Sequence, residues 1–400
     1  MENFDPKGFV EKQIEEIRRL IGKEKAVIAI SGGVDSSTCA VLTHMAIGEN
    51  LICIMLDDAF MREGEPEQVA EILSRPPLSL PVRIERVQER FLKAVEGLKD
   101  AEEKRKAFRR TFYETLGEIA KKEGSKYLVQ GTILADIIET VGGIKTQHNV
   151  LEQMGIRTDE LYGFKVVEPL ATLLKWQVRE VARYLKIPSE ISERQPFPGP
   201  GLLVRVVGQV KREKLASLKK ATSITEKEMA KHKPDQYFSV IMDNVDEVEF
   251  GGIGEIKRLA SKFVGLHQDL LEVRILANKA TGLKEKERRY GNIVKLKCIN
   301  RKGRLLRPKI RDLIDLQKAI IEKNDSVTRV LYTVAEKEGH LPYIVAIRAV
   351  VTRDFLKADV AEIPWSTLET IAHSILMECE NVSEVCYDVT PKPPATIEME

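Results

Sequence analysis

Short runs of apolar residues recur along the first half of the chain and alternate with stretches that have helical spacing. The runs lie at residues 26–30, 51–56, 82–87, 126–130 and 164–167. Each is too short for a helix, but it is continuous enough for a strand that is buried on both faces. The longest helical pattern between them spans residues 101–122. Strands that alternate with helices of this length predict an α/β fold with a doubly wound parallel sheet.

A helix is also predicted before the first of these runs. Val10, Ile14, Ile17 and Ile21 recur at helical spacing, which indicates an apolar stripe that packs against the core. The preceding Asp5-Pro6 supplies a side chain suited to capping the helix and a proline suited to its first turn.

The alternation of strands and helices ends at Pro196-Phe-Pro-Gly-Pro-Gly201. Three prolines and two glycines so close together cannot continue a helix or a central strand, so we place a domain boundary here. Beyond it the pattern is typical of an α+β domain, with helices predicted at 211–220 and 366–380 and strands at 236–241, 343–351 and 384–389. The sequence thus predicts one domain over 1–200 and a second over 201–400, with an inserted segment at about 245–340. No internal repeat is evident.

Composition narrows the class of protein. Of the 400 residues, 43% are hydrophobic and 31% are charged, which is ordinary for a folded protein and argues against extensive disorder. No apolar run is long enough to cross a membrane, and the first residues lack the pattern of a secretion signal. The five cysteines are scattered and never spaced C-x-x-C, so neither a disulfide framework nor a thiolate zinc site is predicted. A cytoplasmic protein is expected.

Positive charge is concentrated in one segment. The net charge is +2, but residues 284–311 contain twelve Lys and Arg against two Glu, so this basic segment carries +10 and the rest of the chain −8. A segment of this kind fits an anionic partner such as a nucleotide, RNA or an acidic protein surface. A solvated face whose counter-charges lie elsewhere in the fold fits equally well.

The strongest chemical signal is the string Ser31-Gly-Gly-Val-Asp-Ser-Ser37, directly after the first predicted strand. Its two glycines allow a tight turn and a close approach to a ligand, and its serines add hydroxyl donors. The helix predicted to follow offers free N–H groups and the positive end of its dipole. Together these features predict a cradle for an oxyanion.

The spacing of this string excludes two common phosphate-binding loops. Neither the Walker pattern G-x-x-x-x-G-K-[ST] nor the dinucleotide pattern G-x-G-x-x-G is present. The string instead resembles the PP-loop of ATP pyrophosphatases. That resemblance implies an enzyme that holds the pyrophosphate of ATP, cleaves ATP between the α and β phosphates, and transfers the adenylyl group to an acceptor oxygen, which a nitrogen or sulfur nucleophile then displaces.

Further strings, in the right order, resemble the ATP-pyrophosphatase part of GMP synthetase. They lie at residues 57–69, 91–106, 130–139, 144–150, 168–170, 194–202, 354–358 and 392–400. The resemblance covers roughly residues 8–242 and 341–400. It implies a ligase that uses ATP and Mg²⁺ to aminate xanthosine monophosphate to GMP through an adenylated intermediate, with release of AMP and pyrophosphate. It also implies that the second domain forms a homodimer.

The same resemblance assigns roles to individual residues. ATP would be bound by Ser31, Gly32, Gly33, Val34, Asp35, Ser36, Ser37, Asp57, Gly131 and Thr132. The catalytic residues would be Asp35, Lys145 and His148, and the magnesium ligands Asp136 and Glu139. The acceptor would be bound by Arg194, Pro200, Gly201, Lys392, Ile397 and Glu398.

Several features depart from the GMP synthetase pattern. Gln195 stands where that family has a histidine, His148 is the single histidine of a paired motif, and Leu151-Glu-Gln-Met154 replaces a Gly-Gly. The segment 245–340 has no counterpart in the resemblance. No Gly-x-Cys-x-Gly nucleophile turn is present either, so ammonia would come from a separate glutamine amidotransferase subunit or from free ammonium.

These departures leave two further hypotheses open. One is a PP-loop enzyme that adenylates RNA or a small carbonyl compound for nitrogen or sulfur transfer. The basic segment favours it, and the absence of C-x-x-C counts against it. The other is a regulator that binds ATP without turnover.

Overall fold

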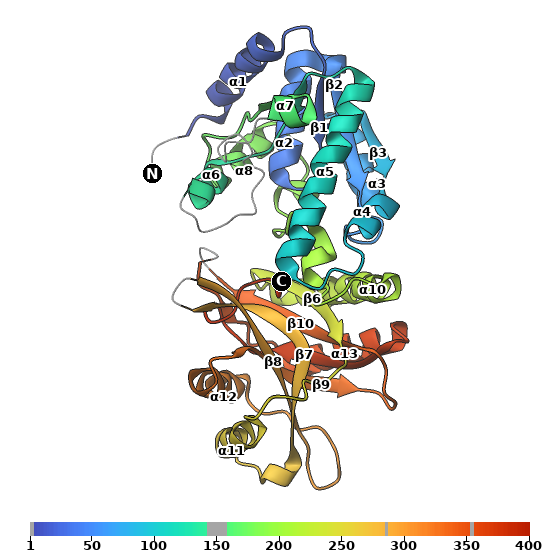
Figure 1. Cartoon of the computed structure of the whole chain (residues 1–400). Coiled ribbons are helices and arrows are strands. Elements are labelled where there is room, and N and C mark those ends of the chain that lie inside the picture. Colours follow the sequence, from blue (N-terminus) through green and yellow to red (C-terminus); the bar gives the residue numbers. More distant parts are fainter. Residues whose placement is uncertain (1–3, 142–157, 285–286, 353–355) are drawn as a thin grey trace. The chain divides into compact units, whose positions relative to one another are not determined.

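The computed structural model describes residues 4–141, 158–284, 287–352 and 356–400 (Figure 1). The chain divides into two compact units. The first contains residues 1–95 and 105–200, and the second contains residues 96–104 and 201–400. No helix among the described residues is both long and apolar enough to span a membrane.

The first unit is built around a five-stranded parallel sheet. Its strands are β1 (Ala26–Ala29), β2 (Leu51–Asp57), β3 (Val82–Arg86), β4 (Tyr127–Val129) and β5 (Lys165–Val167), in the order β3-β2-β1-β4-β5. Each lies within a residue or two of a predicted strand, so the α/β prediction is confirmed. The helices are α1 (Pro6–Ile21), α2 (Val34–Ile47), α3 (Glu65–Ser74), α4 (Gln88–Ala94), α5 (Ala101–Glu123), α6 (Leu134–Val141), α7 (Thr158–Tyr162), α8 (Lys175–Tyr184) and α9 (Ser189–Ser192), with a 3₁₀ turn η1 (Gly48–Asn50).

Both faces of this sheet are covered, which explains why its strands are apolar without interruption. On one face Ile28 and Met55 pack with residues of α1, α2 and α8. On the other face Val27 and Ile54 pack with residues of α5, including Tyr113. Because successive side chains of a strand point to opposite faces, neighbouring residues of β1 and β2 belong to two separate cores.

The first helix begins as the sequence predicts. Asp5 caps α1 by accepting a hydrogen bond from the backbone N–H of Lys7, and Pro6 occupies the first turn. Val10, Ile17 and Ile21 of the predicted stripe are buried. The cap and the stripe together fix where the helix starts and which side of it packs against α2 and α8.

The second unit holds a seven-stranded mixed sheet. Its strands are β6 (Gln236–Asp243), β7 (Leu271–Lys284), β8 (Glu287–Cys298), β9 (Val327–Glu336), β10 (Tyr343–Val351), β11 (Asp359–Val360) and β12 (Val382–Asp388). The order is β11-β10-β12-β9-β8-β7, and β6 pairs with β10. The helices are α10 (Arg212–Met229), α11 (Ile253–Val264), α12 (Ile310–Lys323) and α13 (Trp365–Glu378), with 3₁₀ turns η2 (Gly201–Arg205), η3 (Ala230–His232) and η4 (Gln268–Leu270).

The segment 245–340 contributes α11, β7, β8, α12 and β9, and its three strands extend the sheet formed by β6, β10 and β12. The sequence pattern did not predict these strands, because charged side chains interrupt their apolar positions. Lys295 and Lys297, for example, alternate with apolar residues in the last part of β8. Their buried neighbours Val294 and Leu296 nevertheless place this strand in the core of the sheet.

Candidate functional site

The predicted phosphate cradle lies where β1 ends and α2 begins. In a doubly wound sheet, ligands bind beyond the carboxyl ends of the strands, where the order of strands reverses. In this sheet β1 has β2 on one side and β4 on the other, so the loop 30–33 follows the strand at that reversal. Gly32 adopts φ +77°, a conformation that strongly favours glycine, and Gly33 is the N-cap residue of α2.

Serine hydroxyls brace the loop. Ser31 Oγ lies 3.0 Å from Ser36 Oγ, and the backbone N–H of Ser31 donates to Ser36 Oγ at 3.1 Å. Ser36 Oγ in turn donates to the carbonyl of Gly33 at 3.2 Å. The hydroxyl of Ser37 is buried and has no hydrogen-bond partner within the described protein. The loop therefore keeps a fixed shape and retains an unused hydroxyl donor in the first turn of α2.

The segment after β4 lies directly against this loop. A Cβ atom on Gly131 would lie 2.8 Å from the backbone nitrogen of Ser36 and 2.9 Å from the carbonyl carbon of Asp35. Only glycine allows the two backbones to come this close. The neighbouring Thr132 is buried and donates its hydroxyl to Glu168 Oε1 at 2.6 Å. The structure thus brings the predicted ATP-binding residues 31–37 and 131–132 together.

The two carboxylate oxygens of Asp35 have different surroundings. Its Oδ2 forms an ion pair of 2.6 Å with Nζ of Lys175, whereas its Oδ1 is buried without a hydrogen-bond partner. Burial raises the pKa of the Asp35 carboxyl, the Lys175 ammonium opposes that rise, and the negative charge of Asp136 adds to it. Asp136 therefore lies close enough to Asp35 for their two carboxylates to repel each other.

Asp136 is the one predicted metal ligand whose side chain is described. It belongs to the first turn of α6, where its Oδ2 accepts a hydrogen bond of 3.0 Å from the backbone N–H of Ile133. Glu139 lies in the same helix. The predicted catalytic residues Lys145 and His148 lie outside the described residues. No group of three His, Cys, Asp or Glu side chains forms a ready metal site within the part of the chain that the structure describes.

Arg194, predicted to bind the acceptor, lies beside the phosphate cradle. A Cβ atom on Gly32 would be 3.5 Å from Nη1 of Arg194, and that same nitrogen is 2.6 Å from Oε1 of the buried Glu65. Glu65 also accepts a hydrogen bond of 2.8 Å from the backbone N–H of Arg62, whose guanidinium stacks 4.0 Å above the ring of Phe197. The start of α3 and the proline-rich segment thus converge on the loop.

Asp57 ends β2, at the same edge of the sheet as the loop. It is only 8% exposed, and its Oδ2 accepts hydrogen bonds from Nε2 of Gln88 at 2.5 Å and from Nη1 of Arg86 at 3.3 Å. These two side chains hold the carboxylate in a defined orientation.

The remaining predicted acceptor residues lie at the unit boundary and in the C-terminal tail. Pro200 ends the first unit, and Gly201 opens η2 of the second. Lys392, Ile397 and Glu398 belong to the tail that follows β12. The backbone of Lys392 pairs with that of Ala358, and Ile397 packs against a core cluster. The acceptor residues are therefore divided between the two units.

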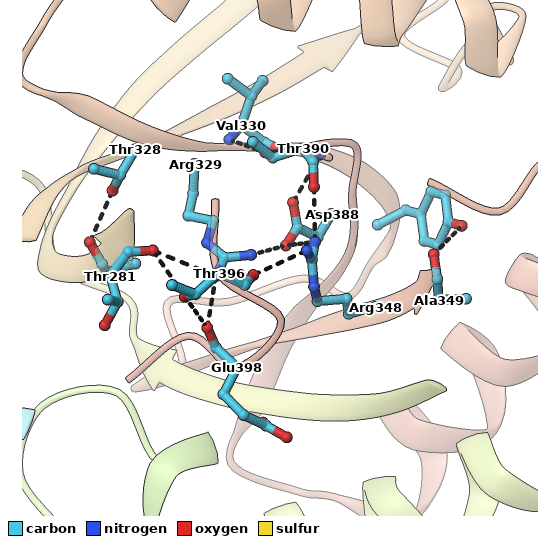
Figure 2. Close-up of polar contacts among 12 residues, drawn as sticks. Thr281, Thr328, Arg329, Val330, Arg348, Ala349, Asp388, Thr390, Thr396 and Glu398 are labelled. Carbon is cyan, nitrogen blue, oxygen red and sulfur yellow. Dashed lines mark hydrogen bonds and ion pairs between the residues drawn. The ribbon is translucent and has the colours of Figure 1, made fainter. Parts of the chain in front are cut away.

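Buried arginines hold the tail in place (Figure 2). Nη2 of Arg329 donates to the carbonyl of Thr396 at 2.7 Å and to that of Glu398 at 2.6 Å, and Arg348 donates to the same Thr396 carbonyl at 3.0 Å. Burial and the neighbouring charge of Arg348 lower the pKa of Arg329 to about 9. The carboxylate of Glu398 forms two hydrogen bonds of 3.0 Å with Arg205. The backbone of the tail is thus fixed by cations that are themselves buried.

Sequence reasoning missed three residues that shape the site, namely Glu65, Glu168 and Lys175. Glu65 follows Gly64 within the string 57–69, and Glu168 begins the string 168–170. Both residues thus lie in strings that resemble the family, but the sequence alone indicates no role for their side chains. Lys175, which pairs with a residue 140 positions earlier, carried no local signal.

Known protein families match regions in both units of the chain. The NAD synthase family matches residues 7–217, and the GMP synthase C terminal domain family matches residues 339–399. A GMP synthase (glutamine-hydrolyzing) subunit from Sulfurisphaera tokodaii is 44% identical over 398 residues, which cover 100% of both chains. The protein of the same name from Saccharolobus solfataricus is 45% identical over 399 residues, which cover 99% of this chain and 100% of that protein.

These alignments run through the segment 245–340 as well, so the segment is shared with the relatives rather than peculiar to this chain. Among solved structures, NMN synthetase from Francisella tularensis has a TM-score of 0.39 at 20% identity and covers 50% of this chain and 78% of that chain. That likeness is too weak to carry any argument.

Proposed function

The chain belongs to the family of these glutamine-hydrolyzing GMP synthase subunits, and on this basis we propose that it catalyses the ATP-dependent amination of xanthosine monophosphate to GMP. The similarity to these relatives over the full length of both chains is the observation that carries the proposal. The braced loop between β1 and α2 supports the use of ATP.

The reaction has two steps, and its atoms balance as follows. The oxygen on C2 of the xanthine base attacks the α-phosphorus of ATP, and pyrophosphate leaves. Ammonia then adds to C2, AMP leaves with the C2 oxygen, and loss of a proton gives GMP. In the first step negative charge develops on the α-phosphate and on the pyrophosphate, so donors and cations directed there lower the barrier.

The loop residues are suited to hold the leaving pyrophosphate. The backbone N–H groups at the start of α2 offer donors together with the positive end of the helix dipole. Ser31, Ser36 and Ser37 add hydroxyls, and that of Ser37 is buried with no partner of its own among the described residues. Gly131 allows the segment that contains Thr132 to close against this loop.

Asp35 and Asp136 support a place for Mg²⁺ at the same edge. Mg²⁺ is commonly held by one or two carboxylates together with phosphate oxygens and waters. Asp35 has a buried oxygen without a partner, and it is repelled by the carboxylate of Asp136. A divalent cation would relieve that repulsion and neutralise charge on the phosphates, and Glu139 in the same helix is a further candidate ligand. Lys145 and His148 remain the candidates for contacts with the reacting groups.

The residues proposed to bind the acceptor belong to the proline-rich segment and to the C-terminal tail. Arg194 offers a guanidinium already held by Glu65, and Lys392 offers an ammonium suited to the monophosphate as a point charge. Pro200, Gly201, Ile397 and Glu398 complete this proposed set. Support for the tail as a binding segment comes from Arg329 and Arg348, whose buried guanidinium groups hold its backbone.

Ammonia is proposed to come from a separate glutamine amidotransferase subunit. A glutaminase of the thiol type needs a cysteine that ionises readily. All five cysteines of this chain are buried, and burial raises the pKa of Cys39 and Cys386 and brings that of Cys53 to about 12. These thiols are therefore unsuited to act as nucleophiles. A second polypeptide that hydrolyses glutamine would supply what this chain lacks.

The basic segment 284–311 gives little support to an RNA substrate, because many of its charges have counter-charges within the fold. Lys284, Arg288, Lys295, Lys297, Arg307 and Arg311 each form an ion pair with a carboxylate outside the segment. Phosphate contacts would have to compete with these pairs. Xanthosine monophosphate is therefore the favoured acceptor.

A single-turnover assay tests the proposal. The chain is incubated with α-labelled ATP, Mg²⁺ and ammonium, with either xanthosine monophosphate or RNA as acceptor. We expect AMP and pyrophosphate only with xanthosine monophosphate, and GMP as the second product. Formation of ADP, or of AMP with RNA alone, would contradict the proposal. Addition of glutamine in place of ammonium should give no GMP until a glutaminase subunit is added.

A further inference from the structure

The second unit contains the same arrangement of elements twice. One set consists of α10, β6, β10, α13 and β12, and the other, inserted after β6, consists of α11, β7, β8, α12 and β9. In each set a helix precedes two antiparallel strands, and a helix then leads to a third strand parallel to the second. We call these sets the outer module (residues 212–243 and 343–388) and the inner module (residues 253–336).

The order of strands is symmetric about the boundary between the modules. Reading across the sheet, β6, β10 and β12 of the outer module are followed by β9, β8 and β7 of the inner module. The two central strands, β12 and β9, are antiparallel. An approximate two-fold axis between β12 and β9 therefore relates the modules, as it would relate two subunits that pair their sheets.

The sequences of the modules agree once this relationship is used. An offset of 55 positions superposes α12 (Ile310–Lys323) on α13 (Trp365–Glu378) with the same length. Continued without a gap, the offset aligns Val327 with Val382, Val330 with Val385, Tyr332 with Tyr387, Val334 with Val389 and Lys337 with Lys392. The buried Leu313, Leu316 and Ile320 of α12 correspond to the buried Leu368, Ile371 and Ile375 of α13.

The pairing registers agree as well. Asn292 of β8 pairs with Val327 of β9, and the equivalent Tyr343 of β10 pairs with Val382 of β12. In both modules a register shift follows immediately at the next residue. Agreement of element order, helix length, register and irregularity makes these modules two copies of one unit. The expectation that the chain has no internal repeat is therefore wrong.

Charges at the centre of the sheet distinguish the two modules. The offset places Arg329 of the inner module at the position of Glu384 in the outer module. Arg329 forms an ion pair of 2.9 Å with Asp388 of the outer module, and Glu384 one of 2.6 Å with Lys295 of the inner module. All four side chains are buried. Each ion pair thus joins one module to the other across the approximate axis, and Figure 2 shows the first of them.

Neither module would pair well with a second copy of itself. Two outer modules would bring Glu384 next to Asp388, and Ala346 would stand where the inner module has Lys295. Two inner modules would bring Arg329 next to Lys295 with no carboxylate from the partner. Buried charges of the same sign repel each other strongly. The opposite charges at equivalent positions of the two modules therefore favour the pairing of one outer module with one inner module.

We propose that the inner module occupies the place of a second copy of this chain, so that the second unit is a complete two-fold assembly within one polypeptide and the protein is a monomer. In place of the homodimer that family resemblance implies, the two modules of a single chain pair with each other. The edge of β12 that a second subunit would pair with is already covered by β9.

Sedimentation equilibrium on the full chain tests this proposal independently of any catalytic activity. We expect the mass of one chain, 45.2 kDa, from low to high micromolar concentration and in both low and high salt. A mass of two chains would overturn the proposal, whether it arose from paired subunits or from exchange of modules between chains. Co-expression of chains with two different tags provides a second readout, because monomers should not be purified together, and joint purification would count against the proposal.

Separate variants test the role of the opposite charges at the equivalent positions Arg329 and Glu384. Arg329→Glu places a carboxylate beside Asp388 and should abolish folding or lower the unfolding temperature sharply. The milder Glu384→Gln should lower it less and leave the mass at one chain. Arg311→Glu, which breaks an exposed ion pair with Glu362, is the matched control and should unfold as the wild type does. Wild-type unfolding behaviour in Arg329→Glu would refute the electrostatic part of the proposal.

Discussion

The ammonium group of Lys175 lies 2.6 Å from Oδ2 of Asp35, and so joins the first residue of α8 to the first turn of α2. Burial favours the protonated form of Asp35, and Lys175 opposes that effect. The chemistry proposed for this site needs an Asp35 that is ionised and able to face a cation. Lys175 is therefore a positioning residue, which acts on the reaction through Asp35.

Replacement of Lys175 by methionine should reduce kcat/KM by about 10- to 100-fold, because a misplaced or protonated Asp35 could not hold the cation and phosphates that we propose it binds. Without the ammonium the pKa of Asp35 rises further, so the loss should be greatest at acidic pH and should lessen as the pH is raised. Steady-state kinetics at a series of pH values measure both effects. Lys126→Met, which breaks an exposed ion pair with Glu24, is the control. A uniform loss at every pH would argue against action through Asp35.

Replacement of Asp35 by asparagine should stabilise the protein at neutral pH while it abolishes turnover. The pKa of Asp35 is raised on folding, so protonated Asp35 favours the folded state at low pH. That contribution is lost as the pH rises through the raised value, and at pH 7 the wild type bears the cost of a partly buried carboxylate. Thermal unfolding without nucleotide should therefore give a higher midpoint for Asp35→Asn at pH 7, and the difference should shrink toward pH 4. A lower midpoint at pH 7 would contradict this account.

Elements with a strong local signal could be predicted from the sequence. The strands of the first unit are buried on both faces and read as continuous apolar runs, and Asp5-Pro6 marked the start of α1. The loop 31–37 could be recognised because its glycines and serines lie within seven consecutive residues. The partners that orient it were not, since Lys175 and Glu65 lie far from it in the sequence and meet it only in the folded chain.

The duplication in the second unit escaped the sequence for a different reason. The modules share few identical residues, chiefly Val and Tyr at spaced positions in or next to β9 and β12 and a Lys beyond each strand. In addition, the inner module is inserted into the sequence of the outer one. The positions that join the modules differ most, as Arg329 and Glu384 do, because a mixed pair needs opposite charges there. The requirement for opposite charges between the two modules thus makes their sequences differ, and this difference obscures the repeat.

Gly131 tests the close approach of the two backbones at the site. In Gly131→Ala the new methyl group would lie under 3 Å from backbone atoms of Asp35 and Ser36, neither of which can rotate away. The loop must shift, and we expect kcat/KM for ATP to fall by about 100-fold, since small displacements of reacting groups have effects of this size. Circular dichroism should show a folded protein. Gly251→Ala, where a Cβ meets nothing within 4 Å, is the matched control, and equal activity of the two variants would rule out the proposed contact.

Glu65 tests whether the position of Arg194 matters for the reaction. The buried carboxylate of Glu65 holds Nη1 of Arg194 at 2.6 Å, next to Gly32 of the loop. Glu65→Gln preserves size and polarity but removes the charge, which should destabilise the fold by about 2 kcal/mol through the loss of a charged hydrogen bond. The freed guanidinium should also raise KM for ATP or for the acceptor more than it lowers kcat. Glu71→Gln in the same helix, where the carboxylate is exposed and paired with the exposed Arg75, should change neither quantity. A stability loss in Glu65→Gln with unchanged KM values would leave Arg194 a purely structural residue.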